Sequence, residues 1–251
     1  MASIDLNADL GETVDGVPTA DDEAMFAVIS SASIACGGHA GDAASIRASV
    51  DRAARLGVAV GAHPSYPDRA GFGRTRIAID PSDLAVSLSA QLRALVDAGA
   101  DLRYVKPHGA LYHSVASDRV EARVVARAVA DLSHRIGRPL PILGLDGAIV
   151  AAAHDADVPF VREAFLDRGY LADGSLVPRG RPGALLDDPD AVAERALRLV
   201  REGVVATVDG PIIEVVAASL CVHGDSPDAV AMAGAVRAVL DAAGIDVRAP
   251  W

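Results

Sequence analysis

The chain has 251 residues, of which 51% are hydrophobic and 23% charged, and its formal net charge is −11. This composition excludes a disordered chain, and the acidic balance argues against a general nucleic-acid binder, which needs a basic face. No apolar run reaches the roughly 18 residues that span a bilayer, the first residues do not read as a signal peptide, and two cysteines make no disulfide framework. We therefore expect a soluble cytoplasmic protein whose residues 1–251 form a single domain.

Short apolar runs alternate with longer amphipathic segments along the chain. The runs predict strands over 3–7, 31–36, 58–63, 102–106, 140–145, 160–165 and 220–223, and a hairpin over 204–217. Apolar residues spaced by three and four predict helices over 42–56, 81–98, 117–136, 190–200 and 228–243. This alternation predicts an α/β fold with a mostly parallel sheet. The length fits a distorted (β/α) barrel of about seven strands, and a doubly wound open sheet is the alternative.

Lysine and the two amide residues occur only once each in a chain that otherwise favours alanine and arginine, as Asn7, Gln91 and Lys106. Asn7 and Lys106 fall at the ends of predicted strands, where barrels and open sheets both place ligands. Lysine is a compact charge that suits a phosphate or a developing oxyanion. Gln91 lies in the middle of a predicted helix, and the sequence assigns it no role.

The first predicted strand runs into the segment DLNADLGE, which holds three carboxylates and an amide. Residues two apart on a strand face the same way, so Asp5, Asn7 and Asp9 are expected to point together into the barrel mouth. Such a cluster can bind a cation or act as acid and base. The alternative interpretation is helix capping with surface polarity.

Histidines follow the later strands. His39 lies in the glycine-rich segment CGGHAGD, and His63 closes an apolar strand ahead of a shaped loop that contains Gly71-Phe72-Gly73-Arg74. That loop could wrap an anion with backbone N–H groups and the Arg74 guanidinium.

His108 follows Lys106, and His223 ends the last predicted strand. The four histidines His39, His63, His108 and His223 could form a metal site if they converge, but their spacing identifies no metal.

The sequence assigns the remaining polar groups no part in binding or catalysis. The adjacent Asp167 and Arg168 suggest an ion pair, and three further histidines are expected to be solvated: His113, His134 and His154. The sequence contains no Walker, zincin, GxSxG or CxxC motif, which disfavours an ordinary ATPase, a zincin and a serine hydrolase.

Taken in order, the segments DLNADLGE, ACGGHAGD, GAHPSYPDRAGFGR, VKPHGALY, EAFLDRGY and CVHGDSPDAV resemble the LamB/YcsF family over nearly the whole chain. The chain departs from the family pattern at Ser33 (commonly Asn), Gly38 (Phe), Thr75 (Arg) and Leu166 (Ala). These departures bear on the shape of the pocket more than on its chemistry.

The resemblance implies a distorted (β/α) barrel of the glycoside hydrolase/deacetylase type. It also implies ATP-dependent cleavage of 5-oxoproline (pyroglutamate) to L-glutamate, in a complex with partner subunits B and C.

A lactam is a poor electrophile, so such a reaction needs cations for phosphate, a base for water and donors for the oxyanion. We expect Lys106 and Arg74 to hold the negative charge of a phosphate or an oxyanion. We expect Asp9 or His108 to activate the attacking water. We assign the positioning of substrate or of an ATP-borne Mg²⁺ ion to Asp5, Asn7, His39 and His63. His223 is assigned to the binding of substrate or phosphate.

Two alternatives remain open. One is a metal-dependent amide or sugar deacetylase with Asp9, His39 and His63 as ligands. The other is a non-catalytic protein that binds 5-oxoproline and passes it to its partners, which the missing nucleotide-binding motif favours.

Overall fold

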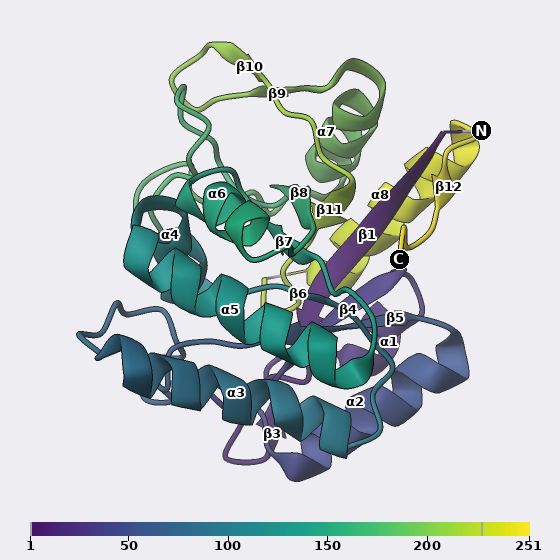
Figure 1. Cartoon of the computed structure of the whole chain (residues 1–251). Helices are drawn as coiled ribbons and strands as arrows, with labels where there is room; N and C mark the ends of the chain where they lie inside the picture. Colours follow the sequence, from purple (N-terminus) through teal and green to yellow (C-terminus); the bar gives the residue numbers. More distant parts are fainter. Residues whose placement is uncertain (1, 227) are drawn as a thin grey trace.

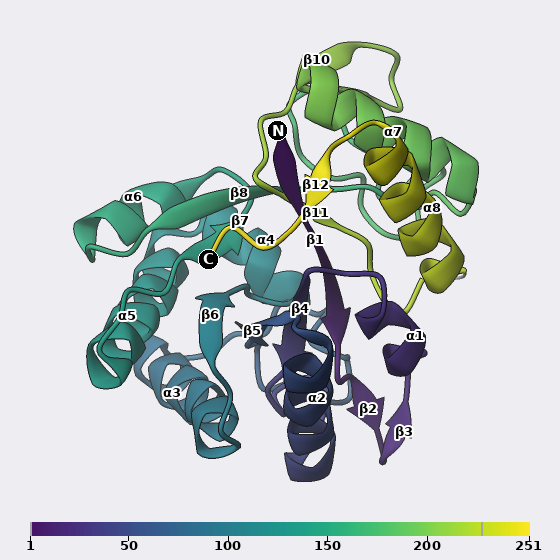
Figure 2. The same cartoon turned by 90° about the vertical axis from the view of Figure 1, so that its right-hand side faces the viewer.

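The computed structural model describes residues 2–226 and 228–251 and contains a closed barrel of seven parallel strands surrounded by helices (Figures 1 and 2). The strands follow one another around the barrel in nearly sequential order, and the last pairs with the first to close it. The barrel strands are β1 (Ser3–Leu10), β4 (Ser31–Ala35), β5 (Ala59–His63), β6 (Leu102–Val105), β7 (Ile142–Gly144), β8 (Phe160–Phe165) and β11 (Ser219–Cys221). The predicted parallel barrel of seven strands is therefore confirmed, and the open sheet is excluded.

Helices connect the strands and cover the outside of the barrel (Figure 1). The five predicted helices are present as α2 (Ala43–Leu56), α3 (Pro81–Asp97), α5 (Arg119–Ile136), α7 (Pro189–Glu202) and α8 (Ala229–Ala242). The predicted hairpin is the antiparallel pair β9 (Val204–Ala206) and β10 (Ile212–Glu214). None of the helices in the described part of the chain is long and apolar enough to cross a membrane.

Several short elements were not predicted: α1 (Asp22–Phe26), α4 (Gly109–Ser117), α6 (Ala148–Asp155), the hairpin of β2 (Thr13–Val14) and β3 (Val17–Pro18), and β12 (Asp246–Val247). The helices α4 and α6 are short and mostly apolar in sequence, and both pack against α5, so their residues show only a weak helical period. β12 adds to β1 through the pairs Ser3–Asp246 and Ile4–Val247.

Helix α2 shows how local sequence directs the chain back along the barrel. Asp42 caps it by accepting hydrogen bonds from the backbone of Ala44 and Ser45, and the Ser45 side chain bonds the Asp42 backbone in return. Gly57 ends the helix with a φ of +70°, a conformation that glycine adopts without steric cost. The buried face of α2 then packs against β4 and β5.

The interior of the barrel is polar along β1. Asp5, Asn7 and Asp9 alternate with apolar neighbours and are all buried, as the strand period predicts. Their depth in the barrel differs, however. Since a strand rises about 3.3 Å per residue, Asp5 lies roughly 13 Å from Asp9 along β1, toward the amino end of the barrel.

Asp5 sits at the amino end of the barrel, which the C-terminal residues cross. Its carboxylate accepts hydrogen bonds from Ser30 and Ser31, each at 2.7 Å, and from Ser219 at 2.5 Å. Trp251 donates a hydrogen bond from Nε1 to Ser31 and stacks on Tyr104. Asp5 is thus enclosed in the floor, which contradicts its predicted contact with substrate.

Burial raises the pKa of Asp5 to about 6, although the serine hydroxyls work against that rise. A raised carboxyl pKa makes the folded state less stable as pH rises from about 4 to about 6, because the unfolded chain ionises first. We expect Asp5→Asn to gain up to about 3 kcal/mol in unfolding free energy relative to the wild type between pH 4 and pH 7. Urea unfolding across that range measures it, with the exposed Asp131→Asn as control, and parallel profiles for Asp5→Asn and wild type would contradict it.

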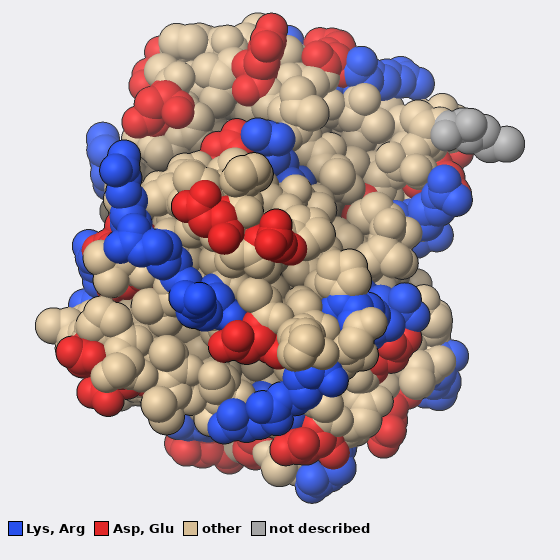
Figure 3. All heavy atoms as spheres, viewed as in Figure 1, with Lys and Arg blue, Asp and Glu red and all other residues tan. Residues whose placement is uncertain are grey.

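On the face shown in Figure 3, basic and acidic side chains alternate, with no large area of one sign. This face offers no basic surface for nucleic acid.

Candidate functional site

A cavity of about 550 Å³ opens at the carboxyl ends of the barrel strands. Its volume suits a small ligand, and its position is where barrel enzymes bind substrates. Six of the nine predicted site residues line it: Asp9, His63, Arg74, Lys106, His108 and His223. The other three do not, since Asp5 lies in the floor, Asn7 lies beneath Lys106, and His39 lies behind His63 and His108.

Lys106 rises from the residue after β6 into the bottom of this cavity and is only 1% exposed. Its Nζ donates to Asp9 at 2.9 Å, to Asn7 at 3.1 Å and to the Cys221 sulfur at 3.1 Å, and lies 3.2 Å from a Glu163 carboxylate oxygen. Burial alone would lower the pKa of Lys106, but these partners outweigh it and hold the pKa well above its usual value. The cavity therefore contains a permanent positive charge.

Asp9 is the corresponding negative charge. One carboxylate oxygen contacts Lys106, and the other lies 3.3 Å from Nε2 of His63. Burial raises the pKa of Asp9, yet His63 and Lys106 together keep it well below the usual range. A carboxylate held at so low a pKa is a weak base, which argues against its predicted role in activating water.

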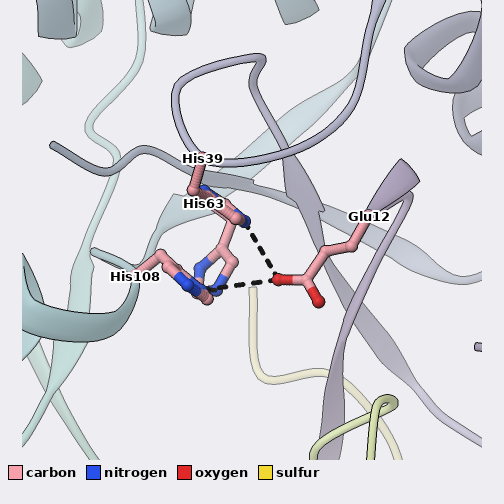
Figure 4. A group of neighbouring side chains, drawn as sticks. All are labelled: Glu12, His39, His63 and His108. Atoms are coloured by element: carbon pink, nitrogen blue, oxygen red, sulfur yellow. Dashed lines mark hydrogen bonds and ion pairs between the residues drawn. The ribbon is translucent and has the colours of Figure 1, made fainter. Parts of the chain in front are cut away.

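Four buried side chains converge beside the cavity: Glu12, His39, His63 and His108 (Figure 4). Nε2 of His39 lies 2.9 Å from the Glu12 carboxylate, and Nδ1 of His108 lies 3.4 Å from the same oxygen. The rings of His39 and His108 stack at 3.6 Å between centroids. Burial lowers the pKa of both these histidines and raises the pKa of Glu12 to about 8.

Both ring nitrogens of His108 are engaged by the protein. Nε2 faces the Phe72 carbonyl oxygen at 2.9 Å, and Nδ1 faces Nε2 of His63 at 2.9 Å. No nitrogen of His108 is left to accept a proton from water, so its predicted role as a general base is not supported by this geometry. His39 likewise joins Glu12 rather than Asp9, and the ligand set expected for a deacetylase (Asp9, His39 and His63) does not form.

His223, unlike His108, has one ring nitrogen held by a carboxylate and the other without a protein partner among the described residues. Its Nδ1 lies 3.0 Å from the carboxylate of Asp167, which also accepts hydrogen bonds from the His223 backbone and from Ser226. Burial raises the pKa of Asp167, but these contacts bring it below its usual value, so the carboxylate is ionised. Nε2 of His223 has no hydrogen-bond partner among the described residues, and the side chain lines the cavity.

Asp167 was predicted to pair with Arg168, and this is wrong. Neighbouring side chains after β8 point in opposite directions, and Arg168 instead donates to the carbonyl oxygens of Ala184 and Val177. Asp167 is therefore free to orient His223.

Three guanidinium groups line the cavity wall: Arg74, Arg168 and Arg179. Arg74 is held by Asp225 at 2.5 Å and lies over the Phe72 ring. Burial, followed by the repulsion of Arg179, lowers the pKa of Arg168 to about 10, and burial followed by the repulsion of Arg74 lowers the pKa of Arg179. A bound anion would relieve the repulsion among these guanidinium groups.

Gln91, to which the sequence assigned no role, anchors the loop after β5. From α3 its buried amide accepts from the Ser65 backbone N–H at 2.9 Å and donates to the Ser65 carbonyl at 2.9 Å. A Cβ added to Gly38 would come within 2.3 Å of the Gln91 oxygen, so glycine lets the β4 loop approach this amide. The pair of hydrogen bonds fixes the loop that follows His63.

We expect Gln91→Leu to lower the unfolding free energy by about 2–4 kcal/mol, because it leaves two buried backbone groups of Ser65 without partners. Ser87→Ala is the matched control: it removes only the Gln91–Ser87 contact and should cost less than about 1 kcal/mol. Urea unfolding compares the two. Equal losses would show that the loop is held by other contacts.

The departures from the family pattern lie outside the cavity lining. Ser33 bonds the hydroxyl of Tyr104 inside the barrel, Leu166 is buried in the core, and neither Gly38 nor Thr75 lines the cavity. The expected change in pocket shape is therefore not found at these positions.

Similarity to known proteins extends over the whole chain. The model of the LamB/YcsF family matches residues 4–250. The 5-oxoprolinase A subunit of Chloroflexus aggregans is 49% identical over all of both chains, and that of Chloroflexus aurantiacus is 44% identical over 100% of this chain and 99% of its own. The crystal structure of the lactam utilization protein from Thermus thermophilus superposes with a TM-score of 0.91 at 42% identity, covering 98% of this chain and 99% of that one. On this agreement of sequence and structure over its whole length, the chain belongs to the LamB/YcsF family.

Proposed function

We propose that this chain acts in the cytoplasm as the A component of a 5-oxoprolinase, with partner subunits B and C. It would hydrolyse 5-oxoproline to L-glutamate and couple this to the hydrolysis of ATP to ADP and phosphate. Support for the substrate comes from the names of its full-length relatives. The observation that carries the chemistry is the Asp167–His223 pair, which faces a cavity that also holds Lys106 and the arginine wall.

The cations suit a reaction in which negative charge develops on the lactam oxygen. Phosphoryl transfer from ATP to that oxygen would make the ring carbon electrophilic, and Arg74, Arg168 and Arg179 are placed to hold phosphate oxygens. Lys106 is placed at the cavity bottom for the developing oxyanion. Mg²⁺ would enter bound to the nucleotide, and we assign it no protein ligand.

Water attack then needs a base. His223 would take the proton from water through Nε2, while Asp167 stabilises the imidazolium that forms. Attack of water at the activated carbon gives a tetrahedral centre, and cleavage of its ring C–N bond, with the proton passing from His223 to the departing nitrogen, would leave the free amine and a γ-glutamyl phosphate. Attack of a second water on that acyl phosphate would release phosphate and leave the carboxylate of glutamate. This assignment places His223, expected to bind substrate, at the centre of the water-activating step.

The test is ATP-dependent release of glutamate from 5-oxoproline, measured for the chain alone and with co-expressed partner subunits. We expect release only with the partners and only with ATP. Glutamate release without ATP would contradict the coupling, and no release from the full assembly would contradict the substrate.

Measuring the binding of ATP and of 5-oxoproline to the isolated chain distinguishes this proposal from the alternative of a non-catalytic protein that binds 5-oxoproline. That alternative predicts that 5-oxoproline binds without nucleotide and that Asp167 and His223 can be replaced without loss of turnover in the assembly. The present proposal predicts that their replacement stops turnover.

A further inference from the structure

We propose that Glu12, His39, His63 and His108 together bind a divalent transition-metal ion of the zinc class beside the cavity. Each offers one ligand atom, and the four atoms all lie within 4.8 Å of one another. The four residues are between 1% and 5% exposed, so these atoms face one another instead of water. The hydrolysis chemistry described above assigns this cluster no role.

The hydrogen-bond arrangement requires a cation or an extra proton in the middle of the cluster. Nδ1 of His63 lies 2.8 Å from the carbonyl oxygen of Lys106, and Nε2 of His108 lies 2.9 Å from that of Phe72. A carbonyl oxygen only accepts, so both of these nitrogens carry their hydrogen. In neutral rings the remaining two nitrogens are then bare acceptors, yet they face each other at 2.9 Å.

The same carbonyl contacts are what a metal-binding histidine needs. A backbone carbonyl that accepts the outer N–H fixes the tautomer and aims the inner nitrogen at the ion. The Glu12 carboxylate approaches His39 and His108 from the opposite side, as Figure 4 shows. The four ligands come from the ends of β1, β5 and β6 and from the loop after β4, so an ion would join four segments of the cavity rim.

The ligand atoms also narrow the choice of ion. Three imidazole nitrogens and one carboxylate oxygen suit Zn²⁺ and its first-row neighbours, whereas Mg²⁺ and Ca²⁺ prefer oxygen. Four protein ligands make a closed tetrahedral site, which is typical of an ion that stabilises structure. We therefore expect the ion to fix the cavity wall formed by His63 and His108.

The experiment uses the untagged full-length chain, stripped with a chelator and dialysed against Zn²⁺. Elemental analysis should give one ion per chain, and the thermal midpoint should rise with Zn²⁺ until the site is full. Replacing Zn²⁺ with Co²⁺ should give the intense visible bands of a four-coordinate ion. Absence of bound Zn²⁺ with an unchanged midpoint overturns the proposal and leaves a proton shared by His63 and His108.

Two variants test the ligand set, Glu12→Gln and His39→Gln, because both keep the side-chain volume near that of the original. Each should weaken Zn²⁺ binding by more than about 100-fold, beyond the effect typical of outer-shell partners. His154→Ala, which changes an exposed histidine on α6, is the control and should bind like the wild type. Circular dichroism shows whether each variant folds without metal, and wild-type affinity in a folded His39→Gln overturns the ligand set.

These readouts are metal content, thermal midpoint and visible absorption, and none depends on turnover. Failure of 5-oxoproline hydrolysis would therefore leave the metal proposal standing, and loss of the metal site would leave the proposed reaction to its own test.

Discussion

Replacing Lys106 with methionine is expected to lower turnover of 5-oxoproline by at least about 10³-fold in the assembled enzyme. The ammonium group is the only positive charge at the cavity bottom among the described residues, and Asp9 and Glu163 both lie within 3.2 Å of it. Methionine keeps the length of the side chain and removes the charge. Two buried carboxylates then lose their partner, so we also expect a loss of about 3–5 kcal/mol in unfolding free energy.

The matched control for this substitution is Arg103→Met, on β6 just before Lys106, with a partly exposed side chain that pairs with Asp101. It should change turnover little and stability by less than about 1 kcal/mol. Glutamate release and urea unfolding are measured on both variants. A folded Lys106→Met that keeps near-wild-type turnover would show that the oxyanion is stabilised elsewhere.

The strand period explains what the sequence could predict. Alternation placed Asp5, Asn7 and Asp9 on the interior face of β1, and the structure confirms that all three are buried there. Periodicity carries no information about height along the barrel, however. Asp5 could be assigned to the floor only after the C-terminal residues were known to cross that end.

Glu12 shows why part of the site escapes such reasoning. Gly11 has a φ of +71°, which ends the regular strand and turns the chain so that Glu12 points back toward His39. The alternation rule no longer applies beyond that turn. The same holds for Arg179, which lies in the long segment after β8 and has no periodic pattern to place it.

Paired side chains were harder to predict than single ones. Asp167 and Arg168 are adjacent in sequence, and an ion pair between them was the simple interpretation. In the structure Asp167 instead meets His223, which lies 56 residues away on the neighbouring strand end. Only the pairing of β8 with β11 brings these two residues together.

The contact between Asp167 and His223 leads to the second prediction of a large loss of turnover. Asp167→Asn and His223→Ala should each lower kcat for glutamate release by about 10²–10⁴-fold, because each removes the oriented base that takes the proton from water. The two residues act as one unit, so the double variant should be no slower than His223→Ala alone. His134→Ala, on the exposed face of α5, is the control and should retain wild-type kcat. If the separate losses multiply in the double variant, Asp167 acts on something other than His223; if neither variant slows turnover, water is activated by another group.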